Sequence, residues 1–492
     1  MTSTDLIGNS DDRVTLSTTE PDTKRGSGLA GHLGTADLVL TALAFAGPLA
    51  GTAGYITIMI STGNGIGTPG AFLATMAVLL LFSVAYGAMT KYVPNPGAFY
   101  AYITAGLGRN VGLGSSFLIL GSYISIGVGF YAFAGLAVQQ FVLSHGGPEI
   151  PWWVYSLVFW VIVGTLAYFR VDVSAKVLGV LLVCEVVIVA IFDVAVMGQG
   201  GATGISFEPF TPTAFTSGQL GIALVFGVAL FSGFESTAVY REETRNPDKT
   251  IPRATMITVL LIGLFYTLTS WALISGLGTA QAVAIATADP AGAFFSVATQ
   301  FGGPILTDAA NVLLITSILA AHLSIQNVTT RYTYSLGVDG IFPTALGKAH
   351  PRFRSPHRAS ITVSLTFLIF TGLLTIAGLT AGEIYAWFAG TASFTIMVAM
   401  TLTSLAAVFY FRRNPQPGLS LWKATIAPAL AFLALAVMVV LAIINFPSLI
   451  GGSQLLSNII LALALLVFAI GVVTAAILRQ KNPNVYQRIG RQ

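Results

Sequence analysis

The chain has 492 residues, of which 55% are hydrophobic and only 9% are charged, and its mean hydropathy is +0.81. This composition excludes an ordinary soluble protein and predicts an all-α polytopic membrane protein. The formal net charge of +4 would suggest a nucleic-acid partner in a soluble domain, but positively charged loops beside a membrane explain it here. A single cysteine, Cys184, excludes a disulfide framework and is expected to pack inside an apolar segment.

Residues 1–34 are polar, and we expect them to form a disordered cytoplasmic tail rather than a signal peptide. Twelve apolar segments follow, and we expect each to cross the bilayer as a helix. They are predicted at 36–60, 68–90, 112–143, 152–169, 174–197, 218–240, 255–277, 304–334, 360–379, 385–411, 424–446 and 453–478. The third and eighth exceed one bilayer thickness and are expected to tilt or to project into the cytoplasm.

The positive charges predict how the chain is oriented. If the N-terminus is cytoplasmic, all 23 Lys and Arg residues lie on the cytoplasmic side of the predicted spans. Cytoplasmic loops carry such an excess of Lys and Arg. The pattern therefore predicts a multi-pass protein of the cell (cytoplasmic) membrane, surrounded by lipid, with both termini in the cytoplasm.

The first predicted span is interrupted by Gly47, Pro48 and Gly51. A proline inside a helix removes a hydrogen bond and frees the carbonyl four residues earlier, here that of Ala44. Alone, this pattern favours an ordinary kinked span, because prolines are common in membrane helices. However, the sixth span is interrupted at the corresponding place of a second five-span half. Such paired interruptions are typical of inverted-repeat transporters that bind substrate between the breaks.

The sixth span carries Phe231, Ser232, Gly233 and Glu235 near the middle of an apolar run. Glycine weakens the helix there, and a carboxylate inside a membrane must face a cavity, a partner or a bound ion. The alternative is a buried glutamate that only bonds to a neighbouring helix. The charged tail at 240–253 favours the functional interpretation.

The string FSGFESTAVYREETRNPDKTIPRA closely resembles the sixth span and following loop of the amino acid, polyamine and organocation (APC) transporters, which read F-x-G-[FY]-E, E-E-x-x-N-P and I-P-R-A. KYVPNPGAFYAYITAGLGRN resembles the family's loop before the third span and the opening of that span. GVDGIFP resembles its R-D-G-x-x-P loop, with Val338 in place of the usual arginine. The resemblance, which is to the bacterial amino acid permease type, implies a LeuT-like fold of two inverted five-helix repeats.

The expected division of the chain follows from the resemblance and the spans. The first repeat should cover 35–200 and the second 215–411. Spans 11 and 12, at 424–478, carry few polar groups and are expected to serve as scaffold or oligomer contact, and a cytoplasmic tail should occupy 479–492.

The substrate is expected between the two breaks, with its amine near freed carbonyls and any anionic end at exposed N–H groups. Phe231 would close the site as an aromatic lid. The hydroxyls of Ser122 and Tyr123 either face the site or bond back to their own helix. The predicted substrate-binding residues are Ala44, Gly47, Pro48, Leu49, Ala50, Gly51, Ser122, Tyr123, Phe231, Ser232 and Gly233.

Three groups lie deep enough in the spans to carry a coupling proton, namely Glu235, Glu185 and His322. The resemblance implies coupling to protons rather than sodium. Some APC relatives carry a lysine near Glu185, where it replaces the sodium of the wider fold, and a carboxylate there could titrate instead. The alternatives are structural: Glu185 as a partner for hydroxyls of span 1 or 8, and His322 as a hydrogen-bonded packing residue.

The first break departs from the family pattern. APC members that carry α-amino acids typically have G-S-G-[IV] there, and the consecutive N–H groups of that turn receive the substrate carboxylate. This chain reads GPLAG at 47–51, and proline has no N–H to give. We therefore expect a site that tolerates amines or decarboxylated analogues, unless the N–H groups at 50–52 take this role one turn later.

The sequence contains no H-E-x-x-H, no P-loop and no G-x-G-x-x-G after a strand, so we expect no enzyme, catalytic residue, metal site or cofactor. A channel would show a repeated filter or rings of like residues, and neither occurs. The sequence predicts a secondary active transporter that imports an amino acid or related amine by alternating access. A polyamine permease, an exchanger, a transporter-like sensor and a channel are the alternatives.

Overall fold

A computed structural model describes residues 33–94, 97–169, 172–290, 292–350 and 355–490. Within these ranges the chain is helical, and an isolated β-bridge pairs Leu33 with Thr244. The predicted cytoplasmic tail at 1–34 lies outside the described residues except for its last two positions.

The first half of the chain forms a series of long helices joined by short ones. These are α1 (Thr35–Ala46), α2 (Pro48–Ala50), η1 (Gly51–Ile56), α3 (Thr57–Thr62), η2 (Gly65–Gly67), α4 (Thr68–Tyr92), α5 (Phe99–Leu107), α6 (Arg109–Ser144), α7 (Trp152–Phe169) and α8 (Asp172–Gly198).

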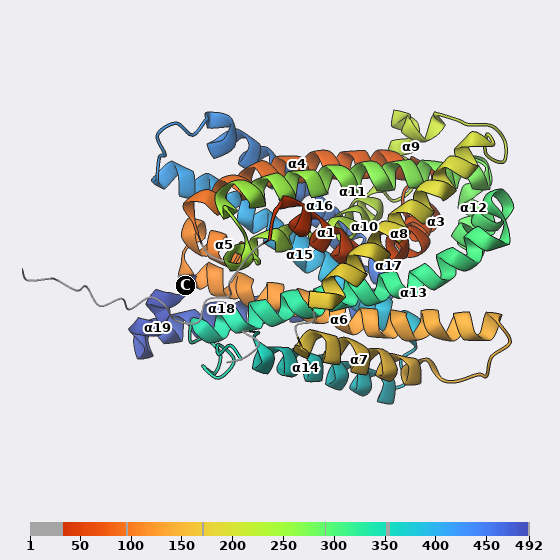
Figure 1. Cartoon of the computed structure of the whole chain (residues 1–492). Coiled ribbons are helices and arrows are strands. Elements are labelled where there is room, and N and C mark those ends of the chain that lie inside the picture. The colour runs from red at the N-terminus through yellow and green to blue at the C-terminus, as the bar shows by residue number, and fades with distance from the viewer. Residues whose placement is uncertain (1–32, 95–96, 170–171, 291, 351–354, 491–492) are drawn as a thin grey trace, which may run out of the picture.

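The second half has the same character. It comprises η3 (Glu208–Phe210), α9 (Pro212–Phe215), α10 (Leu220–Phe231), η4 (Phe234–Ala238), η5 (Arg241–Glu243), α11 (Pro247–Leu277), α12 (Ala282–Ala288), α13 (Ala293–Val338), α14 (His357–Ile376), α15 (Ala381–Arg413), η6 (Trp422–Ile426), α16 (Ala427–Ile444), α17 (Phe446–Ile450), α18 (Gln454–Lys481) and α19 (Pro483–Arg488). In Figure 1, α5 and α19 lie at one end of the bundle and α9 and α12 at the other.

Eleven helices of the described chain are long and apolar enough to cross a membrane. The remaining predicted span, 152–169, is present as α7, a shorter apolar helix. The fold is therefore that of an all-α polytopic membrane protein, as predicted. The described part of α7 has 18 residues, and membrane-spanning helices have about 17–25.

Two glycines lie at boundaries close to the predicted starts of the third and eighth spans. Gly108, with φ 93°, separates α5 from α6, and the third span begins at Arg109, near the predicted start at 112. Gly303, with φ 76°, precedes Pro304 inside α13, and the helix is kinked there. The predicted eighth span therefore starts at the kink, and an additional helical segment precedes it.

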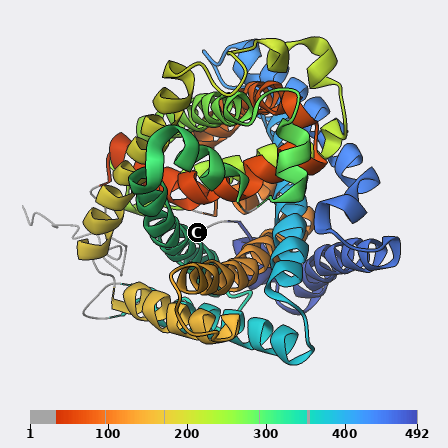
Figure 2. The same ribbon diagram turned by 90° about the vertical axis from the view of Figure 1, so that its right-hand side faces the viewer.

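The interrupted spans occupy the centre of the bundle. In the stretch Leu220–Ala238, 78% of the most apolar window is buried inside the protein, and in Thr35–Thr62 the share is 72%. In α18 the corresponding share is only 11%, so that helix offers most of its surface to the surroundings. Figure 2, which views the bundle from the right-hand side of Figure 1, shows the helices of the chain gathered around the inner ones.

Candidate functional site

The first span is interrupted where the sequence predicts. α1 ends at Ala46, Gly47 has a left-handed φ of 58°, and Pro48 begins α2. Proline suits the first position of a helix because the N–H that it lacks would have no partner there. The chain then passes through the π-helical turn η1 into α3, and such turns are frequent at functional sites.

The sixth span is interrupted as well. α10 ends at Phe231, and the 3-10 turn η4 starts at Phe234. Gly233 between them has φ 112°, which side chains disfavour, and a Cβ atom there would lie 2.6 Å from the Cβ atom of Phe45. Only glycine fits where the sixth span meets the first, so the two breaks lie against each other.

A narrow cavity of about 40 Å³ lies beside the two breaks. In this conformation the space holds only a few water-sized groups, so a larger molecule fits only when the lining side chains move apart. Most lining side chains are apolar or aromatic. The lining residues are Phe45, Ala46, Tyr55, Ser122, Tyr123, Ile126, Phe130, Ala229, Leu230, Ser232, Glu235, Ile325, Ala392, Ser393 and Ile396.

The cavity contains part of the predicted binding set. Ser122, Tyr123 and Ser232 line it, whereas Phe231, the predicted lid, is completely buried and does not. For the predicted residues outside the lining, a role in binding stays a prediction. They are Ala44, Gly47, Pro48, Leu49, Ala50, Gly51, Phe231 and Gly233.

Other lining residues have no counterpart in the prediction. On α6, Ile126 and Phe130 follow Ser122 at helical spacing, so the face could have been extended from the sequence. On α15, Ala392 and Ser393 belong to a span whose sequence carries no break and no charge near this position. No local signal marks that face of α15.

Glu235 is the charged residue of the cavity lining. Its carboxylate accepts a 2.8 Å hydrogen bond from the backbone N–H of Gly233 and a 3.3 Å bond from the hydroxyl of Tyr123. Its backbone carbonyl accepts a 2.6 Å bond from Tyr86 of α4. The break in the sixth span therefore holds this carboxylate against the cavity through its own backbone.

Glu185 of α8 lies at the other break rather than in the cavity lining. It is 1% exposed, and it faces the backbone N–H of Leu49 and the hydroxyl of Ser317 without a hydrogen bond of standard geometry to either. The Ser317 oxygen accepts a 3.4 Å bond from the N–H of Ala50. A carboxylate at this helix start is electrostatically favoured because the first N–H groups of a helix point at it.

His322 of α13 is completely buried, and neither ring nitrogen has a hydrogen-bond partner among the described residues. Its ring centroid is 3.8 Å from that of Tyr131, and Phe130, Phe159 and Phe367 surround it. It does not line the cavity, so its role as a proton acceptor stays a prediction. In the described part of the chain, no group of three or more His, Cys, Asp or Glu residues could hold a metal ion.

An aromatic cluster packs over one side of the cavity. The ring of Tyr55 lies 5.6 Å from that of Phe226 and 6.1 Å from that of Tyr385, and Phe130 lies 6.2 Å from Tyr385. Tyr55 and Phe130 also line the cavity. These rings therefore cover the cavity on this side.

An ion pair joins two elements at the end of the bundle that carries α5 and α19. Arg331 of α13 contacts Glu243 of η5 at 2.8 Å and lies over the ring of Tyr240 at 4.4 Å. Both side chains of the pair are largely buried. Opening the bundle at this end must therefore move or break the pair, because it ties the eighth span to the loop after the sixth.

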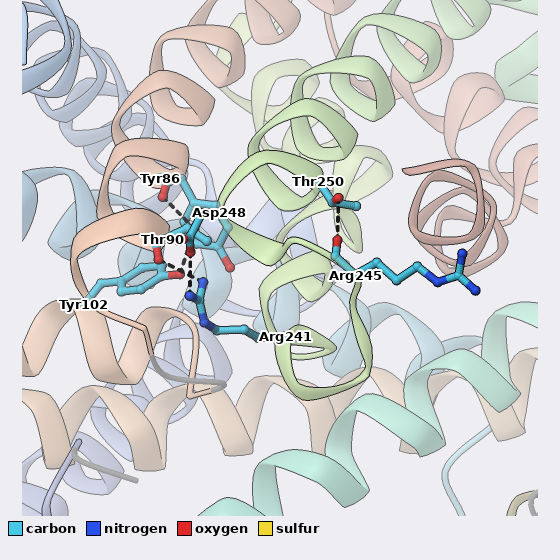
Figure 3. A network of polar contacts seen from close by, with 7 residues as sticks. All are labelled: Tyr86, Thr90, Tyr102, Arg241, Arg245, Asp248 and Thr250. Atoms are coloured by element: carbon cyan, nitrogen blue, oxygen red, sulfur yellow. Dashed lines mark hydrogen bonds and ion pairs between the residues drawn. The ribbon is translucent and has the colours of Figure 1, made fainter. Parts of the chain in front are cut away.

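The loop after the sixth span is held by a second polar network (Figure 3). Arg241 donates a 2.9 Å hydrogen bond to the carbonyl of Thr90 in α4 and a 2.6 Å bond to Asp248 at the start of α11. The hydroxyls of Thr90 and Tyr102 are 2.8 Å apart. The charged tail of the sixth span is thus bonded to α4 and to the start of α11, and α4 is in turn bonded to α5.

Comparison with known proteins agrees with this arrangement. A family model described as amino acid permease matches residues 43–486. The branched-chain amino acid permease BcaP of Bacillus subtilis is 25% identical over 67% of this chain and 72% of its own length. The low-affinity putrescine importer PlaP of Escherichia coli is 22% identical over 61% and 66%, and the lysine-specific permease LysP of Lactococcus lactis is 26% identical over 68% and 70%.

The family model covers most of the chain, including both interrupted spans and the anchored loop. The motifs after the sixth span had implied the same family from the sequence. This protein belongs to the amino acid permease family of the APC transporters.

Proposed function

We propose that the protein is a secondary active transporter that imports an amino acid or a related amine across the cell membrane by alternating access. The observation that carries this proposal is the cavity at two interrupted spans, with one carboxylate in its lining. Broken helices at mid-membrane form the substrate sites of inverted-repeat transporters. The relatives, which are amino acid permeases and a putrescine importer, support this substrate class.

Uptake into proteoliposomes tests the proposal. With a pH gradient, acid outside, vesicles that contain the purified protein are expected to accumulate a radiolabelled amino acid or amine above empty vesicles. Collapse of the gradient with a protonophore should remove the accumulation. Uptake only into vesicles preloaded with unlabelled substrate would support an exchanger. Binding without any uptake would support a sensor.

Coupling to protons rather than sodium is part of the proposal, with Glu235, Glu185 and His322 as the candidate carriers. An ionisable group inside a membrane protein marks an ion pathway or a substrate site by default. Glu185 is favoured because its carboxylate is buried at the first break without a hydrogen bond of standard geometry. A proton could therefore bind there without displacing an existing partner.

The arrangement of twelve spans as five-plus-five inverted repeats, with both termini in the cytoplasm, is also proposed. Cysteines introduced at Gly147 and Glu383 of a Cys184→Ala variant should react with an impermeant maleimide from outside intact cells. Cysteines at Lys249 and Arg354 should react only after permeabilisation; Arg354 lies outside the described residues. Equal labelling of all four from outside would contradict this topology.

A further inference from the structure

The cavity offers no cation to a substrate carboxylate. None of its lining residues is Lys, Arg or His. An α-amino acid that enters would therefore need hydrogen-bond donors from the backbone or from hydroxyl groups to hold its carboxylate, because a buried unpaired charge is costly.

The backbone donors of the first break are turned to other partners. Pro48 has no N–H, and the N–H of Leu49 faces Glu185. Ala50 donates to the hydroxyl oxygen of Ser317 at 3.4 Å, and Gly51 donates to the carbonyl of Gly47 at 2.8 Å. None of residues 47–51 lines the cavity. A carboxylate of the protein thus faces the helix start that a substrate carboxylate would need, and its negative charge disfavours a second carboxylate there.

The second break is used in the same manner. The N–H of Gly233 donates to Glu235 at 2.8 Å, and the N–H of Glu235 faces its own carboxylate. The N–H of Ser232 donates to the carbonyl of Ala229 at 3.0 Å. Both interrupted spans therefore direct backbone donors at internal carboxylates.

The hydroxyl groups of the lining are also engaged. Ser122 donates to the carbonyl of Ala392 at 2.8 Å, Ser393 to that of Ala389 at 2.7 Å, and Ser232 to that of Val228 at 3.4 Å. Tyr123 donates to Glu235, and Tyr55 accepts a hydrogen bond from Tyr385. The cavity thus presents acceptor oxygens, among them a carboxylate, whereas the hydroxyls of its three serines and of Tyr123 already donate to other groups of the protein.

We propose that the cavity binds a monoamine with an apolar body and does not require an α-carboxylate. The ammonium group would sit at Glu235 and the hydroxyl oxygens, where charge and hydrogen bonding both match. Phe45, Ile126, Ile325 and Ile396 surround the rest of the space. A second ammonium group would lie against these apolar side chains, so a diamine fits less well than a monoamine. This inference rests on the proposed transport function and names the substrate class for that same site.

Matched pairs of ligands test the inference on the purified protein in nanodiscs. Binding of isoamylamine and leucine, of 2-phenylethylamine and phenylalanine, and of putrescine and ornithine is measured by calorimetry. Each apolar monoamine is expected to bind ~10- to 100-fold more tightly than its parent amino acid, because hydrogen bonds to a carboxylate are worth one to two decades of affinity. Isoamylamine is expected to bind more tightly than putrescine.

Variants locate the binding group. Glu235→Gln should weaken monoamine binding ~10-fold or more, because it removes the charge and keeps the shape. Asp193→Asn is the matched control: this carboxylate also lies in a span, accepts a 3.0 Å bond from Thr269 and does not line the cavity. It should leave the affinity unchanged. Should Glu235→Gln fail to fold, the comparison of ligands on the natural protein still decides the matter.

The outcomes separate the inference from the function on which it rests. Tight binding and uptake of leucine or phenylalanine, with weaker binding of their amines, overturns the inference and leaves the transporter in place. Stronger binding of putrescine than of either monoamine overturns the restriction to one ammonium group. No binding or uptake of any of the six compounds contradicts both the inference and the proposed function.

Discussion

Glu185→Gln is expected to abolish the accumulation of substrate on a proton gradient while leaving counterflow exchange. Glutamine keeps the shape of the side chain beside Leu49 and Ser317, so the first break should stay intact. It cannot carry a proton, however. With the membrane potential clamped and a gradient of one pH unit, one coupled proton limits accumulation to ~10-fold, since ~1.4 kcal/mol corresponds to a factor of ten. The variant should only equilibrate substrate.

Asp193→Asn, on the same helix, is the control for this experiment. Asp193 accepts a hydrogen bond from Thr269 and is eight residues from Glu185, so its replacement tests whether any carboxylate of α8 suffices. Accumulation should survive in this variant. Glu235→Gln should also lose accumulation, since it changes the cavity itself. If Glu185→Gln and Glu235→Gln both still accumulate substrate, neither carboxylate couples transport, and His322 is the remaining candidate.

Asp339, in the loop after α13, is expected to make stability fall as the pH rises from about 4 to 6. The residue is 1% exposed, and burial raises the pKa of its carboxyl group from 3.8 to about 6. The hydroxyl of Tyr100 donates to it at 2.7 Å and, with the N–H of Gly490 and the charge of Arg488, opposes the shift.

The sign follows from proton binding. Between these two pKa values the folded protein still holds the proton and the unfolded chain has lost it, so the free energy of unfolding decreases as the pH rises. The two-unit difference corresponds to about 3 kcal/mol, which is complete above pH 6. We therefore expect the free energy of unfolding of Asp339→Asn, relative to that of the natural protein, to rise by about this amount between pH 4 and pH 7. Thermal unfolding of both proteins in detergent measures the difference.

A control variant separates this effect from general acid sensitivity. Glu208→Gln removes an exposed carboxylate that is distant in sequence from Asp339. Its free energy of unfolding should change between pH 4 and pH 7 as much as that of the natural protein. Parallel pH profiles for Asp339→Asn and the natural protein would show that the buried carboxyl does not carry the dependence.

Several features could be predicted from the sequence because their causes are local. The apolar composition requires membrane helices, and Gly47–Pro48 and Gly233 interrupt the first and sixth spans because proline lacks an N–H and glycine allows positive φ. The motifs after Phe231 identified the family. Hydropathy placed the start of the third span at 112, close to Arg109, but it did not predict α5 as a separate helix before that span.

The composition of the site was decided by tertiary packing. Ser122 donates to the carbonyl of Ala392, 270 residues away, and no local pattern in either span predicts that contact. Likewise, the sequence placed Glu185 and Leu49 in a common mechanism but not in contact. Which face of a helix lines a cavity depends on how the helix is rotated against its neighbours. In this bundle most helices are apolar on almost every side, so hydrophobic periodicity does not specify that rotation. The sequence by itself therefore determined the family, the membrane helices and the two breaks. Only the fold decided that protein carboxylates lie at both breaks, Glu185 facing the N–H of Leu49 at one and Glu235 accepting from the N–H of Gly233 at the other.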